Sequence, residues 1–153
     1  MQIGNEIDNG LLWDDGKIDG TILQWNKFCD LLKAGIAGIK DGLSNKQSTK
    51  IMVHKADSRD NEKVKDFFDN ILLRGVNFDL IGFSFYPKWH GNFKRLKKNL
   101  NNMAICYGKE IIIVETAWGW TYNKYNNYPN KVDNSKPLNL SFLVKEQKKF
   151  FIR

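Results

Sequence analysis

Two carboxylates that follow apolar segments are the residues best placed to do chemistry. Glu115 comes directly after Ile111-Ile112-Ile113-Val114, and Glu6 follows Ile3-Gly4-Asn5 near the start of the chain. An unpaired carboxylate at the end of a buried parallel strand is costly, so packing explains it poorly. Two such groups can act as proton donor and nucleophile in cleaving a glycosidic bond. We therefore expect a catalytic pair; the alternatives are a surface position for Glu6 and a structural ion pair for Glu115.

Aromatic and imidazole side chains follow the same apolar segments. The stretch 84–91 directly follows the apolar segment 80–85, and His54 closes the segment 51–54. Indole rings pack on the C–H faces of sugars, and amide, hydroxyl and imidazole groups bind sugar hydroxyls or orient carboxylates. The alternatives are an aromatic core cluster with a turn and, for His54, a satisfied structural histidine. The candidate substrate-binding residues are Asn5, Trp13, His54, Tyr86, Trp89, His90 and Trp118.

The elements that must position these groups alternate between strand and helix. Continuous apolar runs predict strands, and apolar residues at three- and four-residue steps predict helices. The predicted strands are 1–5, 51–54, 80–85 and 111–114; the predicted helices are 22–39, 62–74 and 93–107, with a weaker last helix over 143–151. From the second strand onward the strand starts recur at about thirty-residue intervals, which is the size of a βα unit.

Strands that are apolar throughout are typical of a parallel sheet covered by helices on both faces. We therefore predict the α/β class. The glycine fingerprint of dinucleotide folds is absent, which favours a (β/α)8 TIM barrel over a doubly wound sheet. A complete barrel needs about 250 residues. With about four βα units, residues 1–153 are expected to be a single incomplete catalytic domain that begins inside a strand and stops inside a helix.

The composition excludes few classes of function, but it gives no support to a nucleic-acid, metal or membrane site. The formal charge of +7 would suit nucleic acid, yet the lysines are spread over helix faces without a compact basic patch. Cys29 and Cys106 form neither a metal motif nor a disulfide framework, and both fall at apolar helical positions, which predicts burial. No segment is long and apolar enough to span a membrane.

The residues carry a resemblance to glycoside hydrolase family 53, the arabinogalactan endo-β-1,4-galactanases. The matching segments are Ile3-Gly4-Asn5-Glu6-Ile7 with Gly10 and Leu12-Trp13, Ile51-Met52-Val53-His54, Phe78-Asp79 with Gly82, Ser84-Phe85-Tyr86-Pro87 with Trp89-His90-Gly91, and Val114-Glu115-Thr116-Ala117. They occur in the family's order over nearly the whole chain. The resemblance implies a (β/α)8 barrel of which this chain holds units four to seven.

By this resemblance Glu6 matches the acid/base and Glu115 the nucleophile of a retaining enzyme. The implied substrate is β-1,4-galactan, the arabinogalactan I side chains of pectin, cleaved internally by a secreted protein that is monomeric when complete. Tyr86 is expected to hold Glu115 by a hydrogen bond, and Asn5 to bind the sugar 2-hydroxyl. No signal peptide lies in this sequence.

The sequence departs from the family pattern at three places. Phe85 replaces a tyrosine, and Lys55-Ala56-Asp57 leaves the local sugar contacts open. Some members bind calcium in the loop after strand seven, but residues 121–137 offer only Asp133 and several asparagines, so we predict no metal site and no cofactor. The alternative functions are a non-catalytic, degenerate sugar-binding barrel and a basic nucleic-acid-binding domain.

Overall fold

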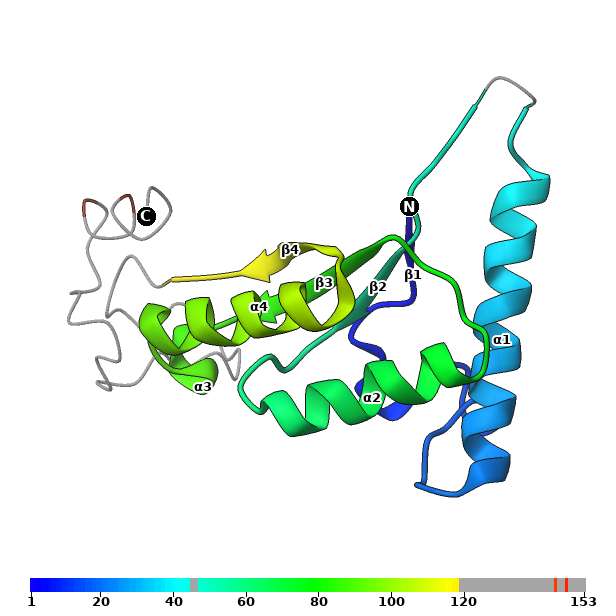
Figure 1. Cartoon of the computed structure of the whole chain (residues 1–153), viewed down its shortest axis with the longest axis horizontal. Coiled ribbons are helices and arrows are strands. Elements are labelled where there is room, and N and C mark those ends of the chain that lie inside the picture. Colours follow the sequence, from blue (N-terminus) through cyan, green and yellow to red (C-terminus); the bar gives the residue numbers. More distant parts are fainter. Residues whose placement is uncertain (45–46, 119–144, 146–147, 149–153) are drawn as a thin grey trace, which may run out of the picture.

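The computed structural model describes residues 1–44 and 47–118, together with Lys145 and Lys148. Its elements follow the order β1 (Gln2–Ile3), η1 (Ile7–Asn9), α1 (Ile22–Asp41), β2 (Met52–Lys55), α2 (Asn61–Leu73), β3 (Leu80–Phe85), α3 (Pro87–His90), α4 (Phe93–Tyr107) and β4 (Glu110–Thr116). The four strands form one sheet in chain order, and all neighbouring pairs are parallel. The predicted α/β class is confirmed: the described residues hold four parallel strands, and each of the first three is followed by a helix that packs on the sheet (Figure 1).

Capping residues decide where the helices begin. The Thr21 side chain accepts a hydrogen bond from the backbone at the start of α1, and Asp60 and Asn92 do the same for α2 and α4. Such caps satisfy amide groups that have no partner inside the helix. Helix α4 ends at Tyr107 and is capped by Gly108, whose φ of 61° lies in the left-handed region. The bounds of β3 and α4 match the predicted ranges.

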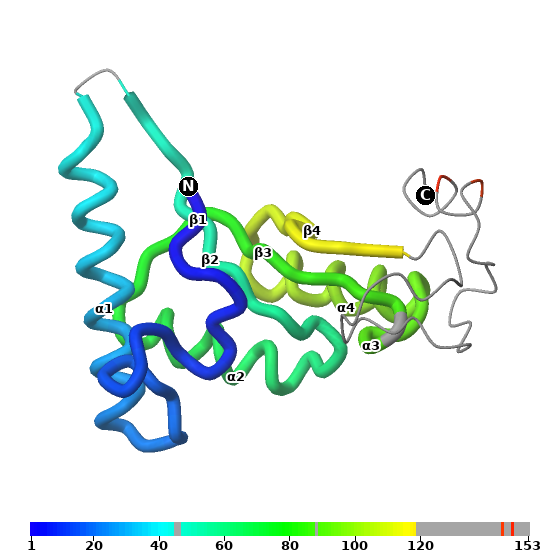
Figure 2. The backbone as a smooth tube through the Cα atoms, turned by 180° about the vertical axis from the view of Figure 1, so that it is seen from behind, coloured from blue at the N-terminus to red at the C-terminus, as the bar shows by residue number. Residues whose placement is uncertain are grey.

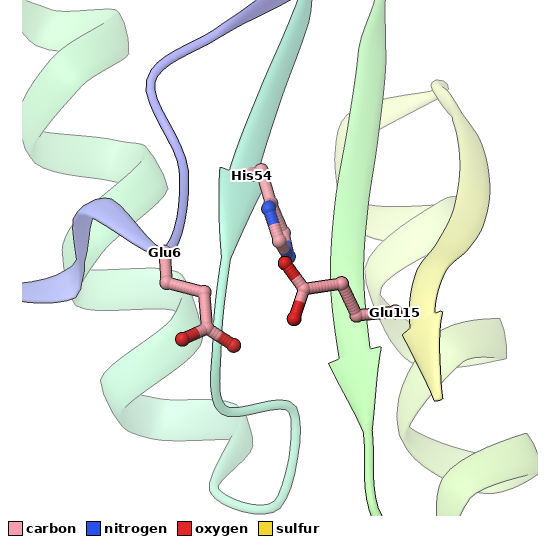
Figure 3. Close-up of side chains that lie close together, drawn as sticks. All are labelled: Glu6, His54 and Glu115. Carbon is pink, nitrogen blue, oxygen red and sulfur yellow. The ribbon is translucent and has the colours of Figure 1, made fainter. Parts of the chain in front are cut away.

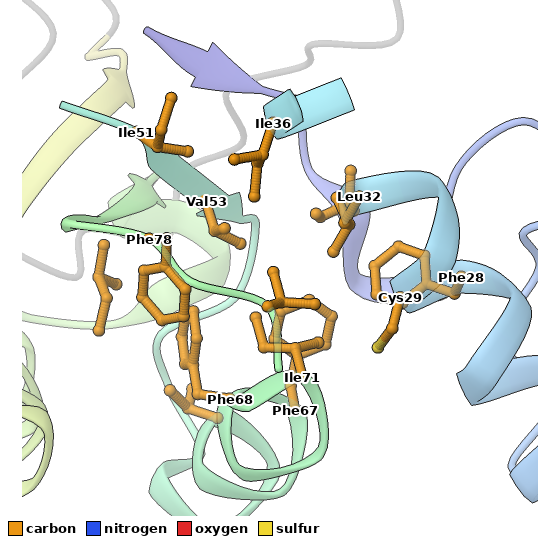
Figure 4. Packing of buried hydrophobic residues seen from close by; sticks show 14 of the residues in the cluster. Phe28, Cys29, Leu32, Ile36, Ile51, Val53, Phe67, Phe68, Ile71 and Phe78 are labelled. Carbon is orange, nitrogen blue, oxygen red and sulfur yellow. The ribbon is translucent and has the colours of Figure 1, made fainter. Parts of the chain in front are cut away.

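The core lies between the sheet and the helices (Figure 4). Phe67, Phe68 and Ile71 of α2 meet residues of α1 and of β2 in one buried cluster. Phe28 and Val53 in this cluster have no exposed surface. Figure 2 shows α1 beside the β1 end of the sheet and α4 beside the β4 end. This core fixes the strands, and the strand ends carry the candidate site.

Four sequence expectations need correction. The first strand covers only Gln2–Ile3, because Gly4 has a φ of 73° that leaves the extended region. The short helix α3 lies within the stretch 84–91, for which the sequence predicted no helix. The early residues of β4 alternate between exposed and half-buried, since β4 is the last strand of the described sheet. Cys29 is buried as predicted, but Cys106 is exposed, because other residues of α4, such as Met103, face the core.

None of the helices in the described part of the chain combines the length and apolarity needed to cross a bilayer. The predicted last helix over 143–151 and the candidate calcium loop 121–137 lie outside the described residues, apart from Lys145 and Lys148.

Candidate functional site

Glu6 projects from a tight turn that directly follows β1. Its backbone is left-handed, with φ 48° and ψ 54°, a conformation that residues other than glycine rarely adopt. The next residue, Ile7, is only 2% exposed. A Cβ added at Gly4 would lie 2.5 Å from Cγ2 of Ile7, so only glycine fits there. The burial of Ile7 and the lack of a side chain at Gly4 thus determine the backbone conformation from which Glu6 projects.

Asp8 ties this turn to the loop after β2. Its carboxylate forms an ion pair with Lys55, and the Lys55 side chain is 8% exposed. It also accepts the backbone N–H of Ala56 at 2.6 Å and that of Asp57 at 3.4 Å. The sequence left the sugar contacts near Lys55 open. The structure shows that the ion pair of Lys55 with Asp8 helps to join the segment after β1 to the loop after β2.

His54 and Ser84 lie on neighbouring strands behind Glu6, and neither has exposed surface. Nε2 of His54 lies 3.0 Å from the Ser84 hydroxyl, which donates to Oε1 of Glu6 at 2.6 Å. Nδ1 of His54 faces the Gln2 amide nitrogen at 3.2 Å and Oδ1 of Asn5 at 3.1 Å. Burial lowers the pKa of His54, against the raising effects of the Glu115, Glu6 and Asp8 charges.

A β-bulge aims Glu115 at the same face of the sheet. Phe83 pairs with Ile113, but the next residue of β3, Ser84, pairs with Glu115, so one residue of β4 is passed over. Paired residues of parallel strands point to the same side, and bulges often re-aim side chains near functional sites. Without the bulge, Glu115 would lie opposite Phe85. Glu115 is half-buried.

Tyr86 orients Glu115. Its hydroxyl donates to Oε2 of Glu115 at 2.9 Å. Burial, followed by that hydrogen bond and the nearby charges of Glu115 and Glu6, raises the pKa of Tyr86 to about 12. The phenol therefore remains a donor at neutral pH, and a donated hydrogen bond stabilises the ionised form of a carboxylate.

These side chains converge (Figure 3). Glu6, His54 and Glu115 each present one oxygen or nitrogen atom, and the three atoms lie within 4.8 Å of one another. Such a cluster could in principle hold a metal ion. However, both ring nitrogens of His54 already face protein partners, and both carboxylates accept hydrogen bonds. We therefore interpret the cluster as a hydrogen-bonded site; the absence of a metal remains a prediction.

Two predicted substrate-binding tryptophans are exposed near this end of the sheet. Trp13 is 60% exposed, and its indole N–H donates to the carbonyl of Asn9 at 3.1 Å. Trp89 is 47% exposed, with its ring centroid 5.6 Å from that of Tyr86. Both rings are open to solvent and could stack on a sugar.

The surroundings of Trp118 differ from the expectation, whereas the role of His90 stays a prediction. Trp118 is only 6% exposed and packs in a small cluster with Phe85, so it is not the open platform that the sequence suggested. His90 accepts the backbone N–H of Tyr86 at Nδ1, 3.0 Å away, and burial lowers its pKa. This contact links His90 to the backbone that carries Tyr86.

Sequence reasoning assigned no role to Ser84, Gln2 or Asp8. Ser84 falls within the segment that carries the resemblance, and its position two residues before Tyr86 on a predicted buried strand could have indicated an inward-facing hydroxyl. Nothing in the local sequence marks Gln2 or Asp8, since their partners lie 52 and 47 residues away along the chain.

Known proteins match this chain over most of its length. The family model described as glycosyl hydrolase family 53 matches residues 1–152. An uncharacterized protein in the bgaB 5′ region of Niallia circulans is 45% identical over 125 residues, which is 79% of this chain and 33% of that protein. The arabinogalactan endo-beta-1,4-galactanase of Humicola insolens is 35% identical over 142 residues, 88% of this chain and 41% of the enzyme.

Solved structures give the same result. The GH53 catalytic domain of Ignisphaera aggregans superposes with a TM-score of 0.81 at 35% identity, covering 97% of this chain and 40% of that one. A structure from a study of two fungal beta-1,4-galactanases gives a TM-score of 0.78 at 34% identity, covering 97% and 44%. The chain thus spans between a third and a half of these relatives, and its fold is part of a TIM barrel. It belongs to glycosyl hydrolase family 53.

Proposed function

We propose that this chain carries the catalytic pair of an endo-acting glycoside hydrolase that cleaves β-1,4-galactan with retention. The observation that carries the proposal is the approach of the Glu6 and Glu115 carboxylates to within 4.8 Å. Retaining enzymes need carboxyl groups about 5–5.5 Å apart, whereas inverting enzymes leave room for a water molecule at about 6.5–9.5 Å. The short separation therefore favours retention.

In the first step, an oxygen of Glu115 attacks the anomeric carbon, and the bond from that carbon to the leaving oxygen breaks. Glu6 gives its proton to the leaving oxygen, and a covalent glycosyl-enzyme forms. In the second step, the ionised Glu6 takes a proton from water, which attacks the same carbon and releases Glu115. The hydrogen bond from Tyr86 orients Glu115 toward the anomeric carbon.

The substrate follows from the relatives and from the exposed aromatic rings. Several relatives are named as arabinogalactan endo-beta-1,4-galactanases or as probable members of that class. The open rings of Trp13 and Trp89 suit the stacking of successive galactose units. We therefore propose arabinogalactan I, the galactan side chain of pectin, as the substrate. We further propose that the protein acts outside the cell and that it is a monomer with a single catalytic domain.

The test is galactan cleavage by this chain and by any longer polypeptide that contains it. We expect release of galacto-oligosaccharides, and a loss of at least about a thousandfold in kcat for Glu6→Gln and for Glu115→Gln. Ser58→Ala is a suitable control, because Ser58 is 3% exposed and its hydroxyl has no hydrogen-bond partner in the described structure. Near-normal cleavage by either Gln variant would remove the assignment, and galactan binding without cleavage would support a non-catalytic sugar-binding role.

A further inference from the structure

A hydrogen-bond chain with a buried middle runs behind Glu6 and uses groups outside the proposed catalytic pair. Gln2 begins it, His54 and Ser84 continue it, and it ends at Oε1 of Glu6. The two middle members come from the adjacent strands β2 and β3 and have no exposed surface. Because water does not reach His54 and Ser84, the neighbouring protein groups determine which of their atoms carry a hydrogen.

The Glu6 end fixes the direction of the first bond. An oxygen of an ionised carboxylate can only accept, and the Ser84 hydroxyl has a single hydrogen. The 2.6 Å contact between Ser84 and Glu6 therefore uses that hydrogen. In the 3.0 Å contact with His54, the Ser84 oxygen can then only accept. His54 must carry its proton on Nε2.

The Gln2 end is compatible with this direction but does not set it. The Gln2 amide nitrogen lies 2.8 Å from the carbonyl of Gly4, 3.1 Å from Oδ1 of Asn5 and 3.2 Å from Nδ1 of His54, and it has two hydrogens for these three acceptors. Nδ1 of His54 also lies 3.1 Å from Oδ1 of Asn5. The tautomer of His54 is therefore set at the Ser84 end, where the proton on Nε2 follows from the Ser84 contact with Glu6.

The charge state of His54 is consistent with this arrangement. Burial lowers its pKa more than the Glu115, Glu6 and Asp8 charges raise it. His54 is therefore neutral at neutral pH, and the hydrogen bonds run in one direction, from His54 through Ser84 to Glu6.

We propose that Ser84 and His54 are positioning residues that reserve one oxygen of Glu6 for proton transfer, an inference that rests on the proposed function. The Ser84 hydroxyl occupies Oε1 in both protonation states of Glu6, since the carbonyl oxygen of a neutral carboxyl group is also an acceptor. The transferable proton is therefore carried on Oε2. Because His54 donates to the Ser84 oxygen, that hydroxyl cannot turn away from Glu6 without leaving a buried donor unpaired.

The first test examines the hydrogen-bond chain by NMR and does not require enzymatic activity. The sequence contains two histidines, His54 and His90, so nitrogen-15 correlation spectra give two ring systems, which the His90→Gln variant assigns. At pH 7 the unchanged protein should show neutral His54 with its proton on Nε2. A proton on Nδ1, or a charged ring, would overturn the inference without any variant having to fold.

Variants sharpen this test. In Ser84→Ala the Nε2 proton of His54 loses its acceptor, so its signal should move and its exchange with water should become faster. The carboxyl carbon signal of Glu6, assigned by its loss in Glu6→Gln, should also move. Ser58→Ala removes a comparably buried hydroxyl that has no partner in the described structure, and it should leave both signals in place. Unchanged signals in Ser84→Ala would contradict the proposal.

The second test measures proton delivery. On galactan, Ser84→Ala should lower kcat by about 10- to 100-fold with KM within about twofold, because misplacing a catalytic group by a fraction of an ångström has costs of this size. On dinitrophenyl β-1,4-galactobioside, whose leaving group departs without a proton, glycosylation should be nearly unaffected. Equal losses on both substrates would indicate a general structural defect and overturn the positioning role.

The outcomes separate the two proposals. If the unchanged chain, and every longer polypeptide that contains it, cleaves neither substrate, the proposed function fails even when His54 shows the expected tautomer. If galactan is cleaved but His54 carries its proton on Nδ1, the proposed function stands and the positioning inference fails.

Discussion

The turn that carries Glu6 and the strand that carries Glu115 present the same chemical group in different ways. Glu6 is exposed and lies outside the sheet ladder. Its orientation depends on partners from β2 and β3 and on the Asp8 contacts with the loop after β2. Glu115 is half-buried inside β4, and the bulge opposite Ser84 together with one donor, Tyr86, sets its direction.

This difference predicts different sensitivities. A turn without ladder hydrogen bonds needs many side-chain anchors, so substitutions at those anchors should disturb Glu6. A strand is held by its backbone pairing, so Glu115 should tolerate the loss of the hydrogen bond from Tyr86 better. The predictions below test this contrast and begin with the largest expected effect.

The roles of the two carboxylates can be told apart by chemical rescue. We expect Glu6→Ala and Glu115→Ala each to lose at least about a thousandfold in activity. Azide should restore turnover of a dinitrophenyl galactobioside in both. In Glu6→Ala azide attacks the glycosyl-enzyme and gives the β-azide; in Glu115→Ala it takes the place of the nucleophile and gives the α-azide. Proton NMR of the product identifies the anomer, and the reverse pattern would exchange the two roles.

The ion pair between Asp8 and Lys55 should matter for stability. Breaking a buried pair leaves a charge without compensation and costs about 3–5 kcal/mol, so Asp8→Asn should lower the free energy of unfolding by about 3 kcal/mol. The pair of Lys50 and Glu110 is the control, because its side chains are 63% and 71% exposed. Glu110→Gln should cost less than about 1 kcal/mol. Urea denaturation measures both, and equal losses would show that the Asp8 anchor has no special importance.

Gly4→Ala tests the path of the turn. Gly4 and Gly75 have similar φ values of 73° and 76°, so an alanine at either position should cost about 1–2 kcal/mol for the left-handed backbone. Only Gly4 also has a neighbour in the way, Cγ2 of Ile7 at 2.5 Å, whereas nothing lies within 4 Å at Gly75. Gly4→Ala should therefore be destabilised by about 1–2 kcal/mol more in urea denaturation. Equal costs would mean that Ile7 moves aside freely.

Tyr86→Phe should have the smallest effect. Removing the donor to Glu115 should lower kcat about tenfold, the usual size for one hydrogen bond to a charged group. Because the pKa of Tyr86 is raised to about 12, the hydroxyl stays protonated across the assay range, and the loss should be the same at every pH below about 10. A loss that disappears with rising pH would contradict the role of Tyr86 as a neutral donor.

The fold and part of the site could be predicted because they follow from periodicity. Apolar runs and three- to four-residue steps indicated the strands and helices, and parallel strands bring their carboxyl ends to one edge of the sheet. This rule brought Glu6 and Glu115 to the same region without any knowledge of the contacts between them.

The bulge could not be predicted, because no side chain marks it. Strict alternation along β4 would place Glu115 on the same face as Ile111 and Ile113, which pack against the core. The irregular pairing at Ser84 reverses that assignment. Trp118 was misjudged for a related reason. An aromatic residue beyond a strand end can face the open site or the neighbouring helix, and only tertiary packing decides between them.

The left-handed backbone of Glu6 has a consequence for how this protein could be improved. A glycine there would adopt the same φ of 48° without the steric cost that any other side chain incurs. The same change would remove the proposed acid/base and the acceptor of the buried Ser84 hydroxyl, so relief of backbone strain is opposed by an unpaired buried donor. Libraries selected for thermal resistance should therefore be screened for activity in parallel, because the strain at this position favours loss of the carboxylate.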